Sequence, residues 1–169
     1  KVLVQARLLA EIVSKLPADS VSLSLNESRV QVSSGSSKFS LSAMSTSDYP
    51  ETPTTPASSG KVSASDFGHA VSQVAVAASR EEVTPVLTAV MISAKTKEIS
   101  LVATDRFRVA VNSIQWQGAA VEREILITAR VLSEIAKTFS HEGDLELGFG
   151  SDEKDMVSFS AGNKSVGTA

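Results

Sequence analysis

A short pattern occurs three times along this chain: an apolar strand, an alanine and an amphipathic helix. The alanines are Ala6, Ala64 and Ala129. The first and third copies agree at six positions, in the pairs Leu3/Leu126, Ala6/Ala129, Arg7/Arg130, Leu9/Leu132, Glu11/Glu134 and Ile12/Ile135. A repeat of this kind uses one supersecondary unit several times, so the chain is expected to fold as an assembly of such units.

Each predicted helix is followed by segments in which apolar and polar residues alternate, as in half-buried strands. The predicted helices cover about 6–16, 65–78 and 129–139. The predicted strands cover 2–4, 21–25, 30–32 and 39–41, then 62–63, 86–94, 99–103 and 109–116, then 125–127, 145–147, 156–159 and a segment near Val166. Each unit is therefore a β-α-β-β-β element of roughly sixty residues, and the fold class is α+β.

The connections between the units differ. Residues 45–59 contain three prolines among serines and threonines, which is typical of an extended linker. Units two and three are joined only by residues 117–123, where Gly118 is predicted to form a turn. We therefore expect half of one domain in residues 1–45, an interdomain linker in 46–60, and a second, nearly complete domain in 61–169.

The first unit has no partner unit in the same domain. Its predicted helix carries an apolar stripe made of Leu8, Leu9, Ile12, Val13 and Leu16. A half-domain of this size cannot cover such a surface alone. We therefore expect a partner unit before residue 1 and further chain after residue 169, which would make this sequence an internal piece of a longer protein.

The composition excludes several classes of protein. Of the 169 residues 42% are hydrophobic, yet no run approaches the ~18 consecutive apolar residues of a membrane span. The absence of cysteine excludes disulfides and fits a cytoplasmic protein. His69 and His141 lie far apart without ligand spacing, so neither a metal nor a cofactor is predicted. The net charge of −3 argues against tight electrostatic binding of nucleic acid.

The predicted helices also share a polar face opposite the apolar stripe. Its members are Arg7, Glu11 and Lys15, then His69 and Gln73, then Arg130, Glu134 and Lys137. One interpretation is a solvated face stabilised by local ion pairs, such as Glu11 with Lys15 at i,i+4. The other is that the repeated helices turn one mildly basic face toward a common object. Repetition favours the second interpretation without establishing it.

A polar segment joins two apolar strands at residues 104–108, which read Thr-Asp-Arg-Phe-Arg. Threonine and aspartate favour turns, so one interpretation is a tight bend in which Asp105 accepts hydrogen bonds from local backbone amides. A phenylalanine between two cations is more typical of a contact surface than of a core.

These residues resemble a known family. Residues 103–110 are similar to the Ala-Thr-Asp-x-x-Arg-[Leu/Val]-Ala motif in the middle domain of bacterial sliding clamps, the β subunits of DNA polymerase III. Residues 34–41 and 48–50 resemble the strand and the Asp-[Phe/Tyr]-Pro linker that end the first clamp domain. Many clamps have Gly-His or Gly-Tyr at positions 106–107 and leucine at Val109. The bulkier Arg-Phe form resembles that of high-GC Gram-positive bacteria.

The resemblance implies a DNA clamp fold and a non-catalytic processivity factor, with domain III absent from this chain. Family members are head-to-tail homodimeric rings that encircle duplex DNA, with helices lining the hole. The candidate DNA-facing residues are Arg7, Lys15, Arg80, Arg130 and Lys137. The resemblance also implies a cleft that binds peptides of the polymerase III α subunit and the clamp loader. Its candidate residues are Pro85, Leu87, Thr104, Arg106, Phe107, Arg108 and Val109. Without domain III we expect no closed ring and only weak peptide binding.

Two other functions remain as alternatives. An enzyme could use Asp105 and its neighbouring arginines, but the chain has no Ser-His-Asp arrangement, no Gly-rich phosphate loop and no paired carboxylates to accompany them. An extracellular β-rich repeat or adhesion module would fit the Ser/Thr-rich strands and the lack of cysteine.

Overall fold

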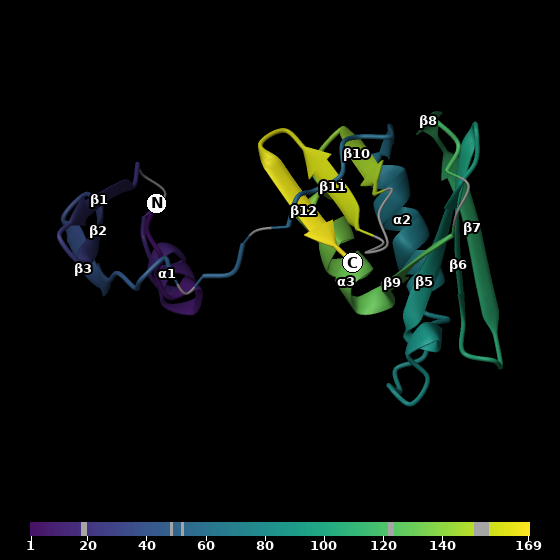
Figure 1. Ribbon diagram of the computed structural model, residues 1–169, viewed down its shortest axis with the longest axis horizontal. Coiled ribbons are helices and arrows are strands. Elements are labelled where there is room, and N and C mark those ends of the chain that lie inside the picture. Colours follow the sequence, from purple (N-terminus) through teal and green to yellow (C-terminus); the bar gives the residue numbers. More distant parts are fainter. Residues whose placement is uncertain (18–19, 48, 52, 122–123, 151–155) are drawn as a thin grey trace. The chain divides into compact units, whose positions relative to one another are not determined.

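The computed structural model describes residues 1–17, 20–47, 49–51, 53–121, 124–150 and 156–169. Asp48 and Arg123, which belong to two of the predicted connecting segments, lie outside the described residues. The chain divides into two compact units (Figure 1), which we call unit 1 (Lys1–Pro53) and unit 2 (Thr54–Ala169). Each unit has its own cluster of buried apolar side chains.

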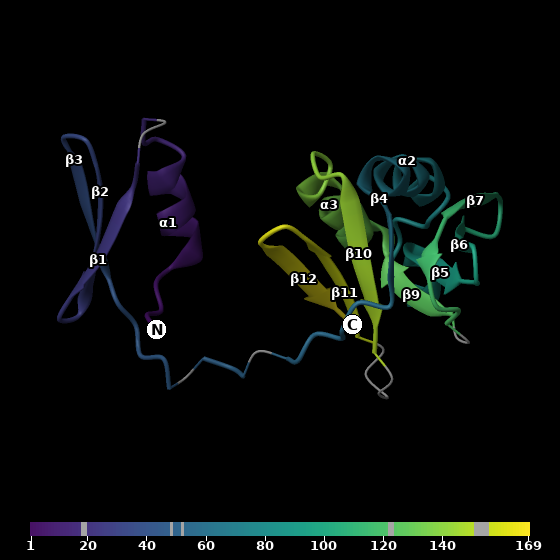
Figure 2. The ribbon, with the colours of Figure 1, turned by 90° about the horizontal axis from the view of Figure 1, so that it is seen from above.

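Unit 1 is one helix against one face of a three-stranded antiparallel sheet (Figure 2). Its elements are α1 (Ala6–Val13), β1 (Ser22–Asn26), β2 (Arg29–Ser34) and β3 (Ser37–Ser42). The sheet order is β1-β2-β3. The predicted strand at 2–4 is reduced to a single bridge between Leu3 and Met44. Within the described residues, no strand pairs with 2–4 over more than this one bridge. The local apolar pattern alone therefore does not produce a strand.

Unit 2 contains the second and third repeats. Its elements are β4 (Gly60–Ser63), α2 (Ala64–Ala75), the 3-10 helix η1 (Pro85–Thr88), β5 (Ala89–Ala94), β6 (Glu98–Thr104), β7 (Val109–Gln115), β8 (Gln117–Gly118), β9 (Ile125–Thr128), α3 (Ala129–Thr138), β10 (Asp144–Phe149), β11 (Val157–Ala161) and β12 (Lys164–Thr168). The strand predicted from residue 86 begins only at Ala89, because Pro85 occupies the first turn of η1, where proline is favoured.

The two repeats of unit 2 exchange their first strands. One sheet has the order β12-β11-β10-β4-β8 and the other β7-β6-β5-β9. Strand β4 of the second repeat pairs antiparallel with β10 of the third, and β9 of the third repeat pairs antiparallel with β5 of the second. The helices α2 and α3 contact each other and lie between the sheets (Figures 1 and 2). Each repeat therefore completes the sheet of the other.

The same local geometry recurs in unit 1. The bridge from Leu3 to Met44 corresponds to the pair Lys61–Gln117 in unit 2, because Leu3 and Lys61 each lie three residues before the repeat alanine. The prediction of a turn at Gly118 is wrong, since this residue pairs with Gly60 in β8. A Cβ on Gly118 would lie 2.6 Å from the ring of Trp116, so glycine is required here for close approach.

The core of unit 2 joins both helices to both sheets. Phe67 of α2 is fully buried, and the centroid of its ring lies 5.8 Å from that of Phe159 in β11. Helix α2 begins at a serine cap, because Ser63 Oγ accepts a hydrogen bond from the backbone N–H of Asp66. The proline-rich segment before β4 also attaches to unit 2, since Ser158 Oγ donates to the carbonyl of Pro56 at 2.9 Å.

Candidate functional site

The segment between β6 and β7 is a tight turn maintained by its own side chains. Asp105 Oδ1 accepts hydrogen bonds from the backbone N–H groups of Phe107 and Arg108, at 3.1 and 3.0 Å. Asp105 Oδ2 accepts from Nε of Arg108 at 2.9 Å. Thr104 Oγ1 donates to the carbonyl of Arg108 and accepts from the N–H of Arg106. The prediction that Asp105 serves local backbone amides is confirmed.

These hydrogen bonds also set the charge of Asp105. Its partial burial alone would raise the pKa of the carboxyl group. The hydrogen bonds from the backbone and guanidinium of Arg108, together with that from Phe107, outweigh this effect and hold the pKa of Asp105 below its usual value. The carboxylate therefore stays ionised at neutral pH and acts as the structural anchor of the turn.

The turn places a large apolar side chain in solvent. Arg106 adopts a left-handed backbone conformation with φ of 79°, which is uncommon for a residue with a Cβ. The next side chain, Phe107, is 92% exposed. Val109, at the start of β7, is 65% exposed. The sequence motif thus builds a rigid turn that presents an aromatic and an aliphatic side chain outward.

Helix η1 lies beside the strand that leads into this turn. It contacts both β5 and β6. Leu87 is half-buried, its N–H donates to the carbonyl of Thr84, and its own carbonyl accepts from the N–H of Ser79. Pro85 is exposed at the first position of η1. These contacts bring η1, with two of the predicted cleft residues, next to the strand that ends in Thr104.

Sequence reasoning missed one member of this surface. Val86, which lies between Pro85 and Leu87, is 55% exposed. The alternating pattern assigned it to the strand that follows, where a valine is ordinarily packed. The proline immediately before it was the available signal, because proline favours the first turn of a short helix and changes which side chains face outward.

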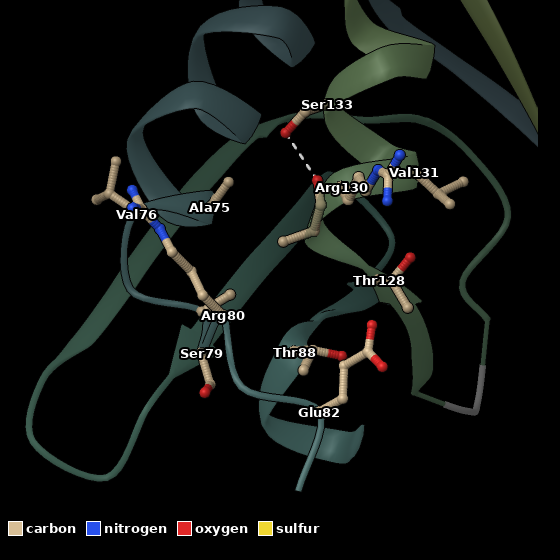
Figure 3. A pocket seen from close by; sticks show the side chains of 12 residues that line it. Ala75, Val76, Ser79, Arg80, Glu82, Thr88, Thr128, Arg130, Val131 and Ser133 are labelled. Carbon is tan, nitrogen blue, oxygen red and sulfur yellow. Dashed lines mark hydrogen bonds between the residues drawn. The ribbon is translucent and has the colours of Figure 1, made fainter. Parts of the chain in front are cut away.

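Several of the predicted DNA-facing cations lie along the helices of unit 2. Arg80 and Arg130 line a hollow of about 770 Å³ between the end of α2, the following loop and the start of α3 (Figure 3). Ser133 also lines it, and its Oγ donates to the carbonyl of Ala129. Lys137 lines a neighbouring groove of about 530 Å³ between α2 and α3, which Ser133 shares. Three of the five predicted DNA-facing cations therefore lie on one side of unit 2.

The exposed helix faces carry local ion pairs. Lys137 Nζ lies 2.9 Å from Glu134 Oε1, and this hydrogen bond is the main reason that the pKa of Glu134 is lowered. In unit 1, Arg7 Nε lies 3.3 Å from Glu11 Oε1, so Glu11 pairs with Arg7 rather than with the predicted Lys15. Arg7 and Lys15 are exposed on unit 1. The structure thus shows local ion pairs on these helix faces, and a shared basic face directed at a common object stays a prediction.

Gln73, a predicted member of the polar helix face, points toward strand β7 instead. Gln73 Oε1 accepts a hydrogen bond of 2.5 Å from Asn112 Nδ2 on β7. Helix α2 packs against β7, so this position faces the sheet edge rather than the groove shared with α3. The helical periodicity of a single sequence did not distinguish these two polar directions.

Two features are absent from the described residues, namely a metal-binding cluster and a membrane-spanning helix. No group of three or more acidic or histidine side chains is arranged to hold a metal ion. In the same part of the chain, no helix combines the length and the apolar character needed to cross a bilayer.

Comparison with known proteins identifies the family. The model of the N-terminal domain of the DNA polymerase III beta subunit matches residues 1–53, and that of its central domain matches 61–169. The beta sliding clamp of Micrococcus luteus is 42% identical over 166 residues, which cover 97% of this chain and 53% of that protein. The beta sliding clamp homolog GriR of Streptomyces muensis is 35% identical over 98% of this chain and 44% of its own length.

Solved structures agree on the fold. The DNA polymerase III subunit beta of Pseudomonas aeruginosa has a TM-score of 0.84 at 21% identity, over 99% of this chain and 46% of that one. The chain spans about half the length of the curated relatives it matches. The predicted clamp fold and the likeness to actinobacterial clamps are confirmed, and these matches give no support to an extracellular repeat module. The chain belongs to the beta sliding clamp family, the β subunits of bacterial DNA polymerase III.

Proposed function

We propose that the protein containing this chain is a processivity factor, which encircles duplex DNA as a homodimeric ring and tethers the replicative polymerase in the cytoplasm. The observation that carries the proposal is the match of two successive clamp-domain models, to residues 1–53 and then 61–169, in one chain. Catalysis has no part in it, because the carboxylate of Asp105 is engaged by the backbone and guanidinium of its own turn.

The distribution of charge supports topological rather than tight binding of DNA. The chain has a net charge of −3, yet Arg80, Arg130 and Lys137 gather along one side of α2 and α3. A ring holds DNA by enclosure, so it needs no strong release of counterions, and many tight phosphate contacts would slow sliding. We propose that these three cations, with Arg7 and Lys15 of unit 1, face the DNA.

The β6–β7 turn supports a peptide-docking role. We propose that a short extended peptide of the polymerase III α subunit or of the clamp loader places its aliphatic and aromatic anchors against Phe107, Val109 and Leu87. Pro85, Thr104, Arg106 and Arg108 would line the same surface. In such interfaces a few well-packed anchors dominate the affinity. The other wall of the cleft would come from a third domain of the full-length protein, so we propose that binding to residues 1–169 alone is weak.

Encirclement can be tested with DNA topology. The full-length protein is loaded onto a nicked circular duplex without any covalent link to the DNA, and the DNA is then linearised. A ring is expected to stay on circles and to slide off linear ends. Retention on linear DNA would contradict encirclement. The Lys137→Ala variant should weaken transient DNA contact without loss of ring retention, because enclosure does not depend on one cation.

The peptide site can be tested by titration. A clamp-binding peptide is titrated against this chain and against the full-length protein, with much tighter binding expected for the latter. Phe107→Ala should weaken binding to the full-length protein by at least ~10-fold, as loss of an aromatic anchor does. Val76→Ala is the matched control, because Val76 is also highly exposed but lies at the end of α2. Equal affinity of the chain and the full-length protein would contradict the shared cleft.

A further inference from the structure

An aliphatic row crosses the outer face of one sheet of unit 2 (Figure 1). Its members lie opposite one another across four strands: Leu126 of β9, Met91 of β5, Val102 of β6 and Val111 of β7. Leu126 and Val111, at the two ends, are 48% and 64% exposed, and the two central side chains are half-buried. The residues that alternate with them on β5, β6 and β9 are buried in the core. The row is therefore a continuous apolar strip on the outside of the sheet.

The fold does not require apolar residues at these positions. The equivalent row of the other sheet of unit 2 also starts three residues before a repeat alanine, and it consists of Lys61, Glu146, Ser160 and Ser165. The equivalent row of the sheet in unit 1 consists of Ser22, Ser33 and Lys38. Every residue of these two rows is polar or charged. Since the same repeat folds with polar residues at these positions, the aliphatic row needs a reason outside the fold.

The aliphatic row is continuous with the β6–β7 turn. Val109 lies on the same face of β7 as Val111, two residues nearer the turn, and is 65% exposed. Phe107, in the turn itself, is 92% exposed. On the side away from the turn, the next row consists of Ser93, Ser100 and Ser113, and the last two hydroxyls share a hydrogen bond of 2.8 Å. The apolar surface thus ends at serines on one side and reaches the proposed peptide site on the other.

The other sheet of unit 2 shows how a segment lies over such an outer face. The proline-rich residues before β4 cross three of its strands without helical structure. Thr55 lies close to Gly167 of β12, the carbonyl of Pro56 accepts a hydrogen bond from Ser158 of β11, and the carbonyl of Ala57 lies close to Gly148 of β10. The outer face of this fold therefore accommodates an extended chain that runs across the strands.

We propose that an extended aliphatic segment of the polymerase III α subunit, adjoining its anchor peptide, crosses the outer face of unit 2 along the aliphatic row. This contact rests on the peptide-docking role proposed above and extends that site beyond the turn. The polymerase is the partner that fits, because a tether must stay bound and added contacts mainly slow dissociation. Strands about 4.8 Å apart make the row about 14 Å long, which an extended segment of about five residues spans.

The contact can be tested by titrating two peptides of the α subunit against the full-length protein. One peptide contains the clamp-binding anchors alone, and the other adds about six natural flanking residues at each end, enough to cross the row. The longer peptide should bind at least ~10-fold more tightly, because it buries further aliphatic side chains. Leu126→Lys/Val111→Ser introduces the residue types of the equivalent positions Lys61 and Ser165. In this variant the longer peptide should bind no more tightly than the shorter one, whose affinity should be unchanged.

Val76→Ser is the matched control for the titration. Val76 is 64% exposed, as Val111 is, but it lies at the end of α2. The control should bind both peptides like the unchanged protein. Equal affinity of the two peptides, or undiminished binding of the longer one by the double variant, would overturn this contact and leave the peptide site in place. No binding of either peptide to the unchanged protein would overturn both the contact and the peptide-docking role.

Coverage of the row by another part of the full-length protein would give a different result. If the row faces solvent until the partner binds, Leu126→Lys/Val111→Ser should lower the melting temperature of the full-length protein by less than ~4 °C, as exposed substitutions do. A larger loss would mean that the protein's own chain packs on the row, and it would overturn the proposal. Thermal unfolding followed by circular dichroism measures this difference, with Val76→Ser as the reference.

Discussion

Units 1 and 2 contain the same repeat, but they bury the apolar side chains of its helix to different extents. Helix α1 has no buried residue, whereas α2 buries Ala64, Phe67, Ala70, Val71 and Val74. Both helices carry an apolar stripe at the same repeat positions. The difference shows that a single β-α-β-β-β element has too little surface of its own to enclose its stripe. Burial arises when a second element supplies a strand, a helix and the facing sheet.

The turns offer a second comparison. The β2–β3 and β11–β12 hairpins turn at Gly35 and Gly162, both with positive φ, where glycine carries no steric penalty. The β6–β7 turn places Arg106 in a similar region, with φ of 79°. The first two turns follow the general preference for glycine at positive φ. The third turn has an arginine there instead, at the place where the family resemblance locates the peptide cleft.

The largest expected effect contrasts equivalent core positions of the two units. Leu132→Ala should lower the free energy of unfolding of unit 2 by about 2–5 kcal/mol, because Leu132 is fully buried. Leu9→Ala, at the same repeat position, should cost unit 1 less, since Leu9 is only half-buried. Urea unfolding followed by Trp116 fluorescence reports unit 2, and amide exchange of β2 reports unit 1. Equal losses would contradict the difference in burial.

A smaller effect is expected from a buried serine in unit 1. Ser34 is 2% exposed, and its Oγ has no hydrogen-bond partner in the described structure. The equivalent residue of the third repeat is Ala161. Ser34→Ala should therefore stabilise unit 1 by about 1 kcal/mol, because it removes an unsatisfied buried hydroxyl. Thermal unfolding by circular dichroism measures this, with exposed Ser40→Ala as a near-neutral control. Destabilisation by Ser34→Ala would contradict the assignment.

A still smaller change in stability is expected from relieving backbone strain at positions with positive φ. Arg106→Gly should raise the stability of unit 2 by up to about 1 kcal/mol, because the left-handed penalty exceeds the entropy cost of glycine. Glu27→Gly is the matched variant, since Glu27 has φ of 52° in the β1–β2 turn. Both should raise the melting temperature of their unit, but only Arg106→Gly should weaken peptide binding. Loss of peptide binding in both variants would contradict a specific role for Arg106.

The smallest expected effect is the loss of stability of the β6–β7 turn at acidic pH. Because the pKa of Asp105 is lowered in the folded turn, its stabilising contribution is complete above the unfolded pKa, about 3.9, and is lost as the pH falls through the folded value. Amide exchange at Phe107 and Arg108 should therefore accelerate, relative to intrinsic rates, below about pH 4. Asp105→Asn keeps an acceptor oxygen and should remove this pH dependence. Unchanged protection at low pH would contradict the ionised anchor.

Local sequence information accounts for much of the fold. The period of the apolar residues located all three helices and most strands, and the Thr-Asp pair anticipated the turn at Asp105. These features depend on neighbours within a few residues. The direction of Gln73 toward β7 and the exposure of Val86 depend on packing against other elements, and helical or strand periodicity carries no such information.

By itself, the sequence determined the repeat, the apolar side of each element and the family to which the chain belongs. The tertiary structure alone decided that β4 and β9 exchange sheets, that Gly60 and Gly118 approach each other next to the Trp116 ring, and that α2 and α3 pack against each other. The physical reason is that an amphipathic pattern specifies which face seeks burial. Pairing between distant strands and helices decides what covers that face.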